Sequence, residues 1–497
     1  TAERRRRFVG RVATNDWDAV VMTRTTFQRL SLSPANQAAY MDRELALIRD
    51  QLDAAKSGGA QSSRTMKQLE KTMLRREEQL KQLLDTPVDP GVTFEASGID
   101  LLVVDELHDY KNLTTPSNIR DAAITGSQRA SDLHMKIDYL RQQNGGRALV
   151  AATATPIANS VTEMWVLQRY LDPDTLADAG LRTFDQWAAT FGEVVSDLEL
   201  AVTGGNNFKV RDRFARFGNV QTLLTMLHRF GDFRTADDLQ LPVPALAERP
   251  DGKRLPAILT LDPTPELESY ISALGDRADA VAMRAVRPDE DNLLKISSDG
   301  RKAALDMRLV QPGTPTGTTK IDAVADLVAR TWERTRDNVY LDPTTGEESP
   351  VRGALQLVFC DMGVPGDKWN VYATLRDELH ARGLPEGSVR FAHEAHNDAE
   401  KGRLFAACRA GHVAVLIGST GKMGVGTNVQ ARAVHLVDMD APWRPADVEQ
   451  RHGRIIRQGN QNPEVAITQI VTGHSFDAYM WQTLEYKSRF IAQVLSG

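Results

Sequence analysis

The sequence predicts an α/β fold of two lobes joined by a helical region. Two observations lead to this prediction: short apolar runs typical of parallel strands alternate with helical stretches up to about residue 170, and the same alternation returns after residue 320. A chain of 497 residues, 41% hydrophobic and 25% charged, has the size and composition of two or three globular domains. Its longest apolar runs fall far short of the roughly 20 residues of a membrane helix, so we expect no membrane partner.

The charge balance limits the possible partners. Lys and Arg number 60 against 66 Asp and Glu, a net charge of −6, so any nucleic-acid site must be a local groove. Cys360 and Cys408 form no CxxC pair, which excludes a disulfide framework or a structural zinc cluster and favours two buried thiols in a reducing compartment. The basic N-terminus has no apolar stretch of signal-peptide length behind it.

The first lobe is expected over residues 1–170. Residues 17–23, WDAVVMT, predict a strand that leads into a helical stretch. Apolar residues at heptad spacing then predict an antiparallel helical hairpin over 36–87, whose charged faces we interpret as solvated surface. IDLLVV at 99–104 and ALVAAT at 148–153 predict parallel strands buried on both faces.

The strand pattern fades over residues 171–317, which predicts a helical inter-lobe region. The second lobe is expected over 318–497, with strands at 355–360, 412–419, 433–440 and 465–472 and helices between them.

Polar residues follow both strands of the first lobe. Asp105 and Glu106 lie at the carboxyl end of a strand, where ligands bind in open parallel sheets. One carboxylate can hold Mg²⁺ that bridges nucleotide phosphates, while its neighbour orients the attacking water. Two acids at a strand end are, taken alone, more often just solvated. Thr153 and Thr155 end the next strand and can hydrogen-bond a neighbouring carboxylate or backbone group.

In the second lobe, the strand at 412–419 leads into a glycine-rich turn, GSTGKMGVGTNVQ. Farther on, Gln450, Arg454 and Arg457 are spaced four and three residues apart, which predicts one shared helical face. Two arginines one turn apart can present planar donors to a polyphosphate.

The sequence contains four motifs in the order DELH, TATP, GVGTN and QRHGRIIRQG. Motifs in this order resemble those of superfamily-two helicases and translocases, most closely the Swi/Snf-type DNA-dependent ATPases. That group has a pattern of W-x-P, followed by Q, then R, then R-x-G. In this sequence the matching residues are Trp443, Pro445, Gln450, Arg454, Arg457 and Gly459. The helical hairpin resembles large bacterial, phage or plasmid-borne helicase proteins, which are often fused to DNA methylase modules. The resemblance covers about residues 10–170 and 320–497.

This resemblance implies two RecA-like lobes, with ATP between them and duplex or single-stranded DNA across both. Asp105 would hold Mg²⁺ and Glu106 would be the general base. Nucleotide binding and its coupling to DNA would fall to His108, Thr153, Thr155, Gly424, Gly426, Asn428 and Gln450, with Arg454 and Arg457 as arginine fingers. Candidate DNA-backbone contacts are Thr23, Arg24, Ser419, Thr420 and Lys422. The resemblance also implies a cytoplasmic protein of a bacterium, phage or plasmid, with a DNA methylase module as a possible partner.

One departure from the family is serious. The sequence has no GxxxxGK[ST] loop to cradle phosphates, and GSTGKMG at 418–424 has the wrong spacing. We therefore expect the C-terminal part of a larger protein, with an incomplete first lobe, an unpaired edge on the strand at 148–153 and little ATP hydrolysis of its own. The alternatives are a non-hydrolysing scaffold that binds DNA or a partner and, less favoured, a metal-binding protein. The metal reading rests on FAHEAHND, whose ligand-type residues are His393, Glu394, His396 and Asp398, spaced unlike a helical zinc motif.

Overall fold

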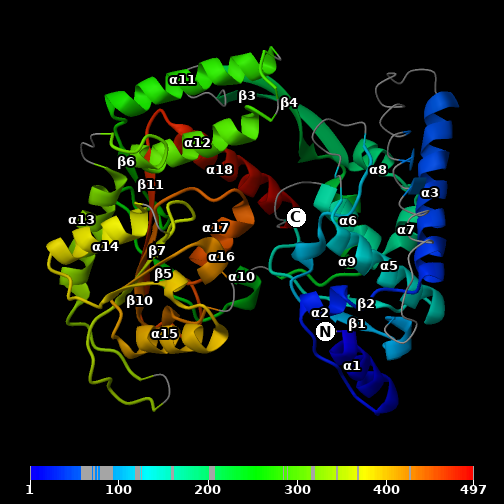
Figure 1. Cartoon of the computed structure of the whole chain (residues 1–497), viewed down its shortest axis with the longest axis horizontal. Coiled ribbons are helices and arrows are strands. Elements are labelled where there is room, and N and C mark those ends of the chain that lie inside the picture. The colour runs from blue at the N-terminus through cyan, green and yellow to red at the C-terminus, as the bar shows by residue number, and fades with distance from the viewer. Residues whose placement is uncertain are drawn as a thin grey trace. The chain divides into compact units, whose positions relative to one another are not determined.

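A computed structural model describes residues 2–495 except 58–69, 71–72, 75–76, 79–92, 118–123, 125, 158–161, 201–207, 235, 284, 288, 315–318, 343–344, 367–368 and 425–426. The chain folds into two compact units (Figure 1). Unit 1 comprises Thr1–Ser196, Asp212–Phe233 and Gln493–Gly497, and unit 2 comprises Asp197–Arg211 and Arg234–Ala492.

Unit 1 is mainly helical. Its helices are α1 (Ala2–Thr14), α2 (Arg24–Gln28), α3 (Pro34–Ser57), α5 (Gln128–Gln143), α6 (Thr162–Leu171), α7 (Pro173–Asp178), α8 (Phe184–Phe191) and α9 (Val220–His228), with the 3-10 turns η2 (Glu95–Ser97) and η3 (Leu107–Tyr110).

Helix α3 is the first arm of the predicted hairpin. Leu45, Ile48 and Leu52 of the heptad pattern are buried, as expected for an apolar stripe. The second arm lies largely outside the described residues, although Glu77 is described and pairs with Arg49 at 2.9 Å. The charged faces of α3 are not solvated throughout, because some of their side chains contact other helices. The interpretation of these faces as solvated surface is therefore wrong in part.

Two charged side chains of α3 contact neighbouring helices. Arg43 forms an ion pair with Asp138 of α5, and Glu44 accepts a 2.7 Å bond from Arg169 of α6. These polar positions hold the hairpin arm against the rest of unit 1.

The sheet of unit 1 has two described parallel strands, β1 (Leu102–Val104) and β2 (Leu149–Ala151), with Val103 paired to Val150. Both strands were predicted, but burial on both faces was wrong, since Val103 is 75% exposed and Val150 55%. Among the described residues β2 pairs with β1 alone, as the expectation of an unpaired edge required.

The strand predicted over residues 17–23 does not form. Among the residues that the structure describes, the chain between α1 and α2 has no ladder partner, and Val21 is 97% exposed. An extended segment becomes a strand only when its backbone groups pair with a neighbour.

The region 171–317 combines helices with strands that the sequence did not predict. β3 (Gly192–Leu200) and β4 (Phe208–Phe217) form a two-stranded sheet, while β5 (Ala245–Leu246) and β6 (Ala257–Leu261) join the sheet of unit 2. Helices α10 (Ala236–Leu239), α11 (Pro265–Ala282) and α12 (Leu293–Leu305) and the turn η4 (Met307–Leu309) also lie here. The two compact units share this region between them.

Unit 2 is built on a parallel sheet in the order β11-β10-β7-β9-β8, with β5 and β6 both pairing with β11. Its other strands are β7 (Leu355–Phe359), β8 (Val389–Phe391), β9 (Val415–Gly418), β10 (Ala433–Asp438) and β11 (Glu464–Thr472). The four strands predicted here are confirmed, and β8 was missed. The predicted α/β class is confirmed.

Helices cover both faces of this sheet (Figure 1). α13 (Lys320–Thr335) and α14 (Val371–Ala381) pack on Val358, Ile417 and Val437. α15 (Asp398–Ala410) packs on the opposite face, against Leu357 and Leu416. Coverage of both faces explains why these strands are continuous apolar runs.

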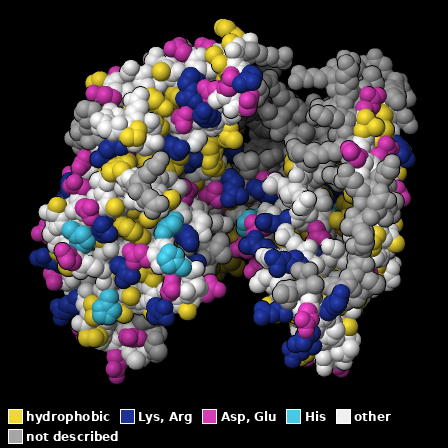
Figure 2. Space-filling model, viewed as in Figure 1, with side chains coloured by type: hydrophobic (Ala, Val, Ile, Leu, Met, Phe, Trp, Pro, Cys, Tyr) yellow, Lys and Arg dark blue, Asp and Glu magenta, His cyan; other side chains and the backbone are white. Residues whose placement is uncertain are grey.

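The remaining elements of unit 2 are α16 (Thr420–Met423), α17 (Pro445–His452), α18 (Phe476–Leu495), η5 (Ala392–Glu394) and η6 (Gln430–Arg432). Cys360 and Cys408 are both buried free thiols, as predicted. No described helix is long and apolar enough to cross a membrane. Acidic and basic side chains are interspersed over the face shown in Figure 2, in keeping with the small net charge.

We predict that unit 2 loses stability in mild acid because of His435, which is buried between Gln356 and Thr468. Burial lowers the pKa of His435 from its ordinary 6.5 to about 4. The unfolded chain therefore binds the proton first, so this stability is complete above pH 6.5 and falls as the pH drops towards 4. Between pH 7.5 and 5, His435 by itself contributes a loss of about 2 kcal/mol.

Urea titrations of the chain and of His435→Gln at both pH values measure this loss. The acid loss should shrink in His435→Gln and persist in His412→Gln, which changes an exposed histidine. An unchanged acid loss in His435→Gln would refute the assignment.

Candidate functional site

In unit 1, the acidic turn after β1 is tied to the end of β2. Leu107 N donates to Ala152 O at 3.0 Å, and Glu106 N donates to Asp105 Oδ1 at 2.9 Å. Between these bonds the backbone of Glu106 is left-handed, with φ 56° and ψ 51°. This conformation costs a non-glycine residue free energy and is common at functional sites.

His108 connects the acidic turn to the threonines that follow β2. Its Nδ1 lies 3.0 Å from Glu106 Oε2 and 3.3 Å from Thr153 Oγ1. Thr153 Oγ1 also accepts the Thr155 N–H at 3.1 Å, and the Thr155 side chain is buried. The structure thus brings Asp105, Glu106, His108, Thr153 and Thr155 together at one end of the two-stranded ladder.

The candidate DNA contacts of unit 1 lie at the start of α2. Thr23 is the N-cap, and its hydroxyl accepts the Thr26 N–H at 3.3 Å. Arg24 forms an ion pair with Asp109, three residues after Glu106. Arg24 is therefore linked to the turn that carries the acidic pair.

In unit 2, the glycine-rich turn follows β9. Ser419 is the N-cap of α16, and Lys422 is exposed in its last turn. Gly424 N donates to Thr420 O at 2.6 Å, and a Cβ at Gly424 would lie only 2.3 Å from that oxygen and 3.2 Å from Gln450 Oε1. Asn428 O accepts a 2.8 Å bond from Arg409, while Gly426 lies outside the described residues.

Arg454 and Arg457 do not lie on one helical face with Gln450, so that prediction is wrong. Helix α17 ends at His452, Gly453 is its C-cap, and both arginines follow in turns. They nevertheless converge: Arg454 Nη1 and Arg457 Nη1 each donate to Thr427 O at 3.2 Å, and Arg454 Nη2 donates to Gly424 O.

The sequence reasoning missed a buried charge cluster beside this turn. Arg451 has no solvent exposure and makes ion pairs with three carboxylates, those of Asp361, Asp438 and Asp440, at 2.8, 3.0 and 3.0 Å. Asp438 also accepts from His452 Nε2 at 2.8 Å. The available signal was the pair of acids two residues apart at the end of an apolar strand, VHLVDMD.

Asp438, which ends β10, and Asp440, two residues later, are both buried, and their pKa values are shifted in opposite directions. Burial works to raise the pKa of Asp438, but His452 and Arg451 outweigh it and lower that pKa. Burial raises the pKa of Asp440 to about 6, because Arg451 is shared among three acids and the charge of Asp361 lies nearby. One guanidinium thus does not fully compensate the three carboxylates.

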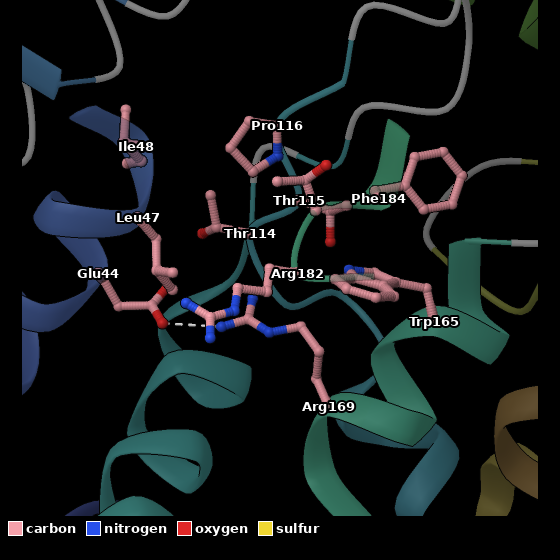
Figure 3. A pocket seen from close by; sticks show the side chains of 11 residues that line it. Glu44, Leu47, Ile48, Thr114, Thr115, Pro116, Trp165, Arg169, Arg182 and Phe184 are labelled. Atoms are coloured by element: carbon pink, nitrogen blue, oxygen red, sulfur yellow. Dashed lines mark hydrogen bonds and ion pairs between the residues drawn. The ribbon is translucent and has the colours of Figure 1, made fainter. Parts of the chain in front are cut away.

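Unit 1 also has a pocket away from the motif residues (Figure 3). Trp165 and Phe184 line it, and Arg169 points toward Glu44. No residue predicted from the motifs lines this pocket.

Two of the candidate metal ligands in FAHEAHND, Glu394 and His393, interact with protein groups. Glu394 Oε1 accepts the Phe391 N–H at 3.0 Å, and its other oxygen accepts from Arg390 at 2.6 Å. Burial and nearby Lys422 lower the pKa of His393. Within the part of the chain that the structure describes, no group of three or more His, Cys, Asp or Glu residues could hold a metal ion.

Two family models match the chain: a probable helicase domain over residues 1–235 and the helicase conserved C-terminal domain over residues 356–459. The chain is helicase-like over both matched regions. The second match runs from β7 to the turn after Arg457, so it includes both arginines and the buried cluster of this helicase-like chain.

A curated relative of the helicase-like chain is the Defense against restriction protein B of Escherichia phage P1, 29% identical over 167 residues. That match covers 31% of the chain and 7% of the relative, so the chain spans only a small part of that protein. A crystal structure of the C-terminal part of the Fun30 ATPase domain is similar over 36% of this chain and 54% of the Fun30 chain. The sequence identity is 16% and the TM-score is 0.24. A score this low does not establish a shared fold.

We predict that Glu106→Gly is more stable than Glu106→Ala by about 1 kcal/mol, since glycine adopts the left-handed conformation without steric cost. The same pair of variants at Glu333, exposed in helix α13, should show the opposite order by about 1 kcal/mol. Urea unfolding of the four variants measures both differences. Equal stability of the two Glu106 variants would mean that the turn is not strained.

We predict that Gly424→Ala destabilises unit 2 by about 1–3 kcal/mol, because the new methyl group overlaps the Thr420 carbonyl. Gly421→Ala is the matched control, since nothing lies within 4 Å of a Cβ at that position. Thermal unfolding should show a lower midpoint for Gly424→Ala alone. A Gly424→Ala midpoint equal to that of the wild type would contradict the close approach.

Proposed function

We propose that this chain is part of an ATP-dependent DNA translocase or helicase motor of the Swi/Snf-like type. The observation that carries the proposal is the pair of clusters at strand ends, one in each unit: Glu106 with His108 and Thr153 in unit 1, and Arg454 with Arg457 at the glycine-rich turn in unit 2. A carboxylate that orients water and arginines that contact phosphate are recurring parts of phosphoryl-transfer sites.

The residues of unit 1 fit a magnesium nucleotide. Asp105 is exposed, and the Glu106 N–H occupies only its Oδ1, which suits a cation that keeps several waters. Mg²⁺ at Asp105 would neutralise phosphate charge. Glu106 would accept a proton from the attacking water, and the 3.0 Å contact with His108 holds its carboxylate in place. Through Thr153, His108 would couple this base to the end of β2.

In unit 2, Arg454 and Arg457 would contact the phosphates. Both donate to the carbonyl oxygen of Thr427, which a phosphate can replace as the stronger hydrogen-bond acceptor. Gly424, Gly426, Asn428 and Gln450 would shape the turn beneath them. Ser419, Thr420 and Lys422 would bind the DNA backbone there, as Thr23 and Arg24 would in unit 1.

The alternative is a non-hydrolysing scaffold that binds DNA or a partner protein. The lack of a GxxxxGK[ST] loop in this sequence favours it. The helicase family matches support action on nucleic acid, and the phage relative supports a phage or bacterial cytoplasmic setting. A DNA methylase module as a partner remains part of the proposal.

We predict that the chain binds DNA through Lys422 but hydrolyses ATP at most weakly. Anisotropy of a labelled duplex and a labelled single strand, at several salt concentrations, measures the binding. Lys422→Gln should weaken it about 3- to 10-fold and reduce the salt slope by about one, as loss of one phosphate contact does. Lys253→Gln removes an equal charge from an exposed turn and should leave binding unchanged.

ATP turnover with and without DNA completes the test. Strong DNA-stimulated turnover that Glu106→Gln abolishes would contradict the prediction of weak hydrolysis. Absence of binding to either DNA would reject the motor altogether. Binding that Lys422→Gln and Lys253→Gln weaken equally would favour the scaffold.

A further inference from the structure

We propose that Arg451 is a positioning residue that couples the DNA-contact segment Ser419–Lys422 to the phosphate-contact arginines Arg454 and Arg457. This inference rests on the function proposed above. It concerns a residue to which neither the motif reading nor the family comparison gave a role.

The side chain of Arg451 uses all of its nitrogens inside unit 2. Nε donates to Thr420 Oγ1 at 2.8 Å, Nη1 to Asp438 Oδ1 at 3.0 Å and to Asp440 O at 2.8 Å. Nη2 donates to Asp361 Oδ2 at 2.8 Å and to Asp440 Oδ1 at 3.0 Å. These acceptors follow β7, follow β9 and end β10, so one guanidinium joins three loops at the carboxyl edge of the sheet.

Thr420 is held from two sides. Its N–H and its hydroxyl donate to Asp361 at 2.6 and 3.0 Å, while the hydroxyl oxygen accepts from Arg451. The hydroxyl thus uses its donor and one acceptor position within the cluster. A displacement of Thr420 by bound DNA must therefore move Arg451 or break one of these bonds.

The bonds from Thr420 to Arg454 form a closed ring. Thr420 O accepts from Gly424 N, and Gly424 O accepts from Arg454. Arg454 N donates back to Arg451 O at 3.0 Å, and the Arg451 side chain returns to Thr420. The same four-residue stretch of backbone, from Arg451 to Arg454, thus carries both the buried anchor and the first proposed phosphate-contact arginine.

Lysine cannot replace this anchor. Its ammonium group is a point charge with three donors, whereas the guanidinium presents five donors in a fixed plane. Arg451→Lys keeps the charge among the three carboxylates but cannot reach Thr420, Asp438 and Asp361 together. The variant therefore tests the link rather than the charge.

The ring predicts a transmitted effect. DNA bound at Ser419–Lys422 should slow amide exchange there and also in residues 446–459, and Arg451→Lys should keep the first effect and reduce the second at least about 3-fold. Hydrogen exchange of the full chain, with and without a duplex oligonucleotide, measures both segments at once.

Arg432→Lys is the matched control. Arg432 is equally buried in unit 2, but it donates to the carbonyls of Arg409 and Val351 at 2.7 and 2.6 Å. It should lose stability as any buried arginine-to-lysine variant does and still transmit the DNA effect. A merely structural role for Arg451 predicts the same result for both variants, and that result would overturn the proposal.

A second pair of variants tests the same link in case Arg451→Lys does not fold. Thr420→Val removes the hydroxyl that Arg451 holds, and Thr420→Ser retains it. The quantity to compare is the slowing of amide exchange by DNA at 446–459, divided by the slowing at 413–430. This ratio should fall towards zero in Thr420→Val and keep its wild-type value in Thr420→Ser. Equal transmission in both variants would refute the coupling. If DNA changes nothing at 413–430 in the wild-type chain, the proposed DNA contact itself fails, which is a different outcome from loss of transmission alone.

Discussion

The candidate site of unit 2 depends on the burial of one guanidinium group. Away from water, Arg451 must place its N–H groups on protein acceptors, because an unsatisfied buried charge is far too costly to retain. Those acceptors come from residues that follow or end three strands. The requirement to satisfy Arg451 therefore fixes the distances between loops that otherwise share no backbone pairing.

Unit 1 supports its cluster by different means. The acidic turn is held by one backbone bond, from Leu107 to Ala152, and by the contacts of His108. The ladder beneath it has two described strands, with Val103 and Val150 exposed side by side. Directly after the acidic pair, the buried side chains of Leu107 and Tyr110 anchor the turn in unit 1.

The sequence was most informative where both faces of a strand are covered. The strands of unit 2 are continuous apolar runs because helices pack on each side, whereas the three-residue β8 is too short to give such a run. Residues 17–23 have strand composition, yet a strand also needs a partner, and composition does not show whether one exists. Helical spacing placed Gln450 and Arg457 on one face, but α17 ends at His452. The role of Arg451 depends on burial, which the residue type does not reveal.

The two kinds of arginine at this site differ in how their charge is balanced. The charge of Arg451 is balanced by three carboxylates, and burial and the neighbouring Asp361 leave Asp440 with a raised pKa. Arg454 and Arg457 donate instead to the carbonyl oxygens of Gly424 and Thr427, which are neutral acceptors. Three carboxylates face one guanidinium in the buried cluster, so Arg451 contributes order to the site and no net positive charge. Residues 451–457 thus contain one arginine that carboxylates hold and two that donate to backbone carbonyls, and only the latter two are proposed to contact phosphate.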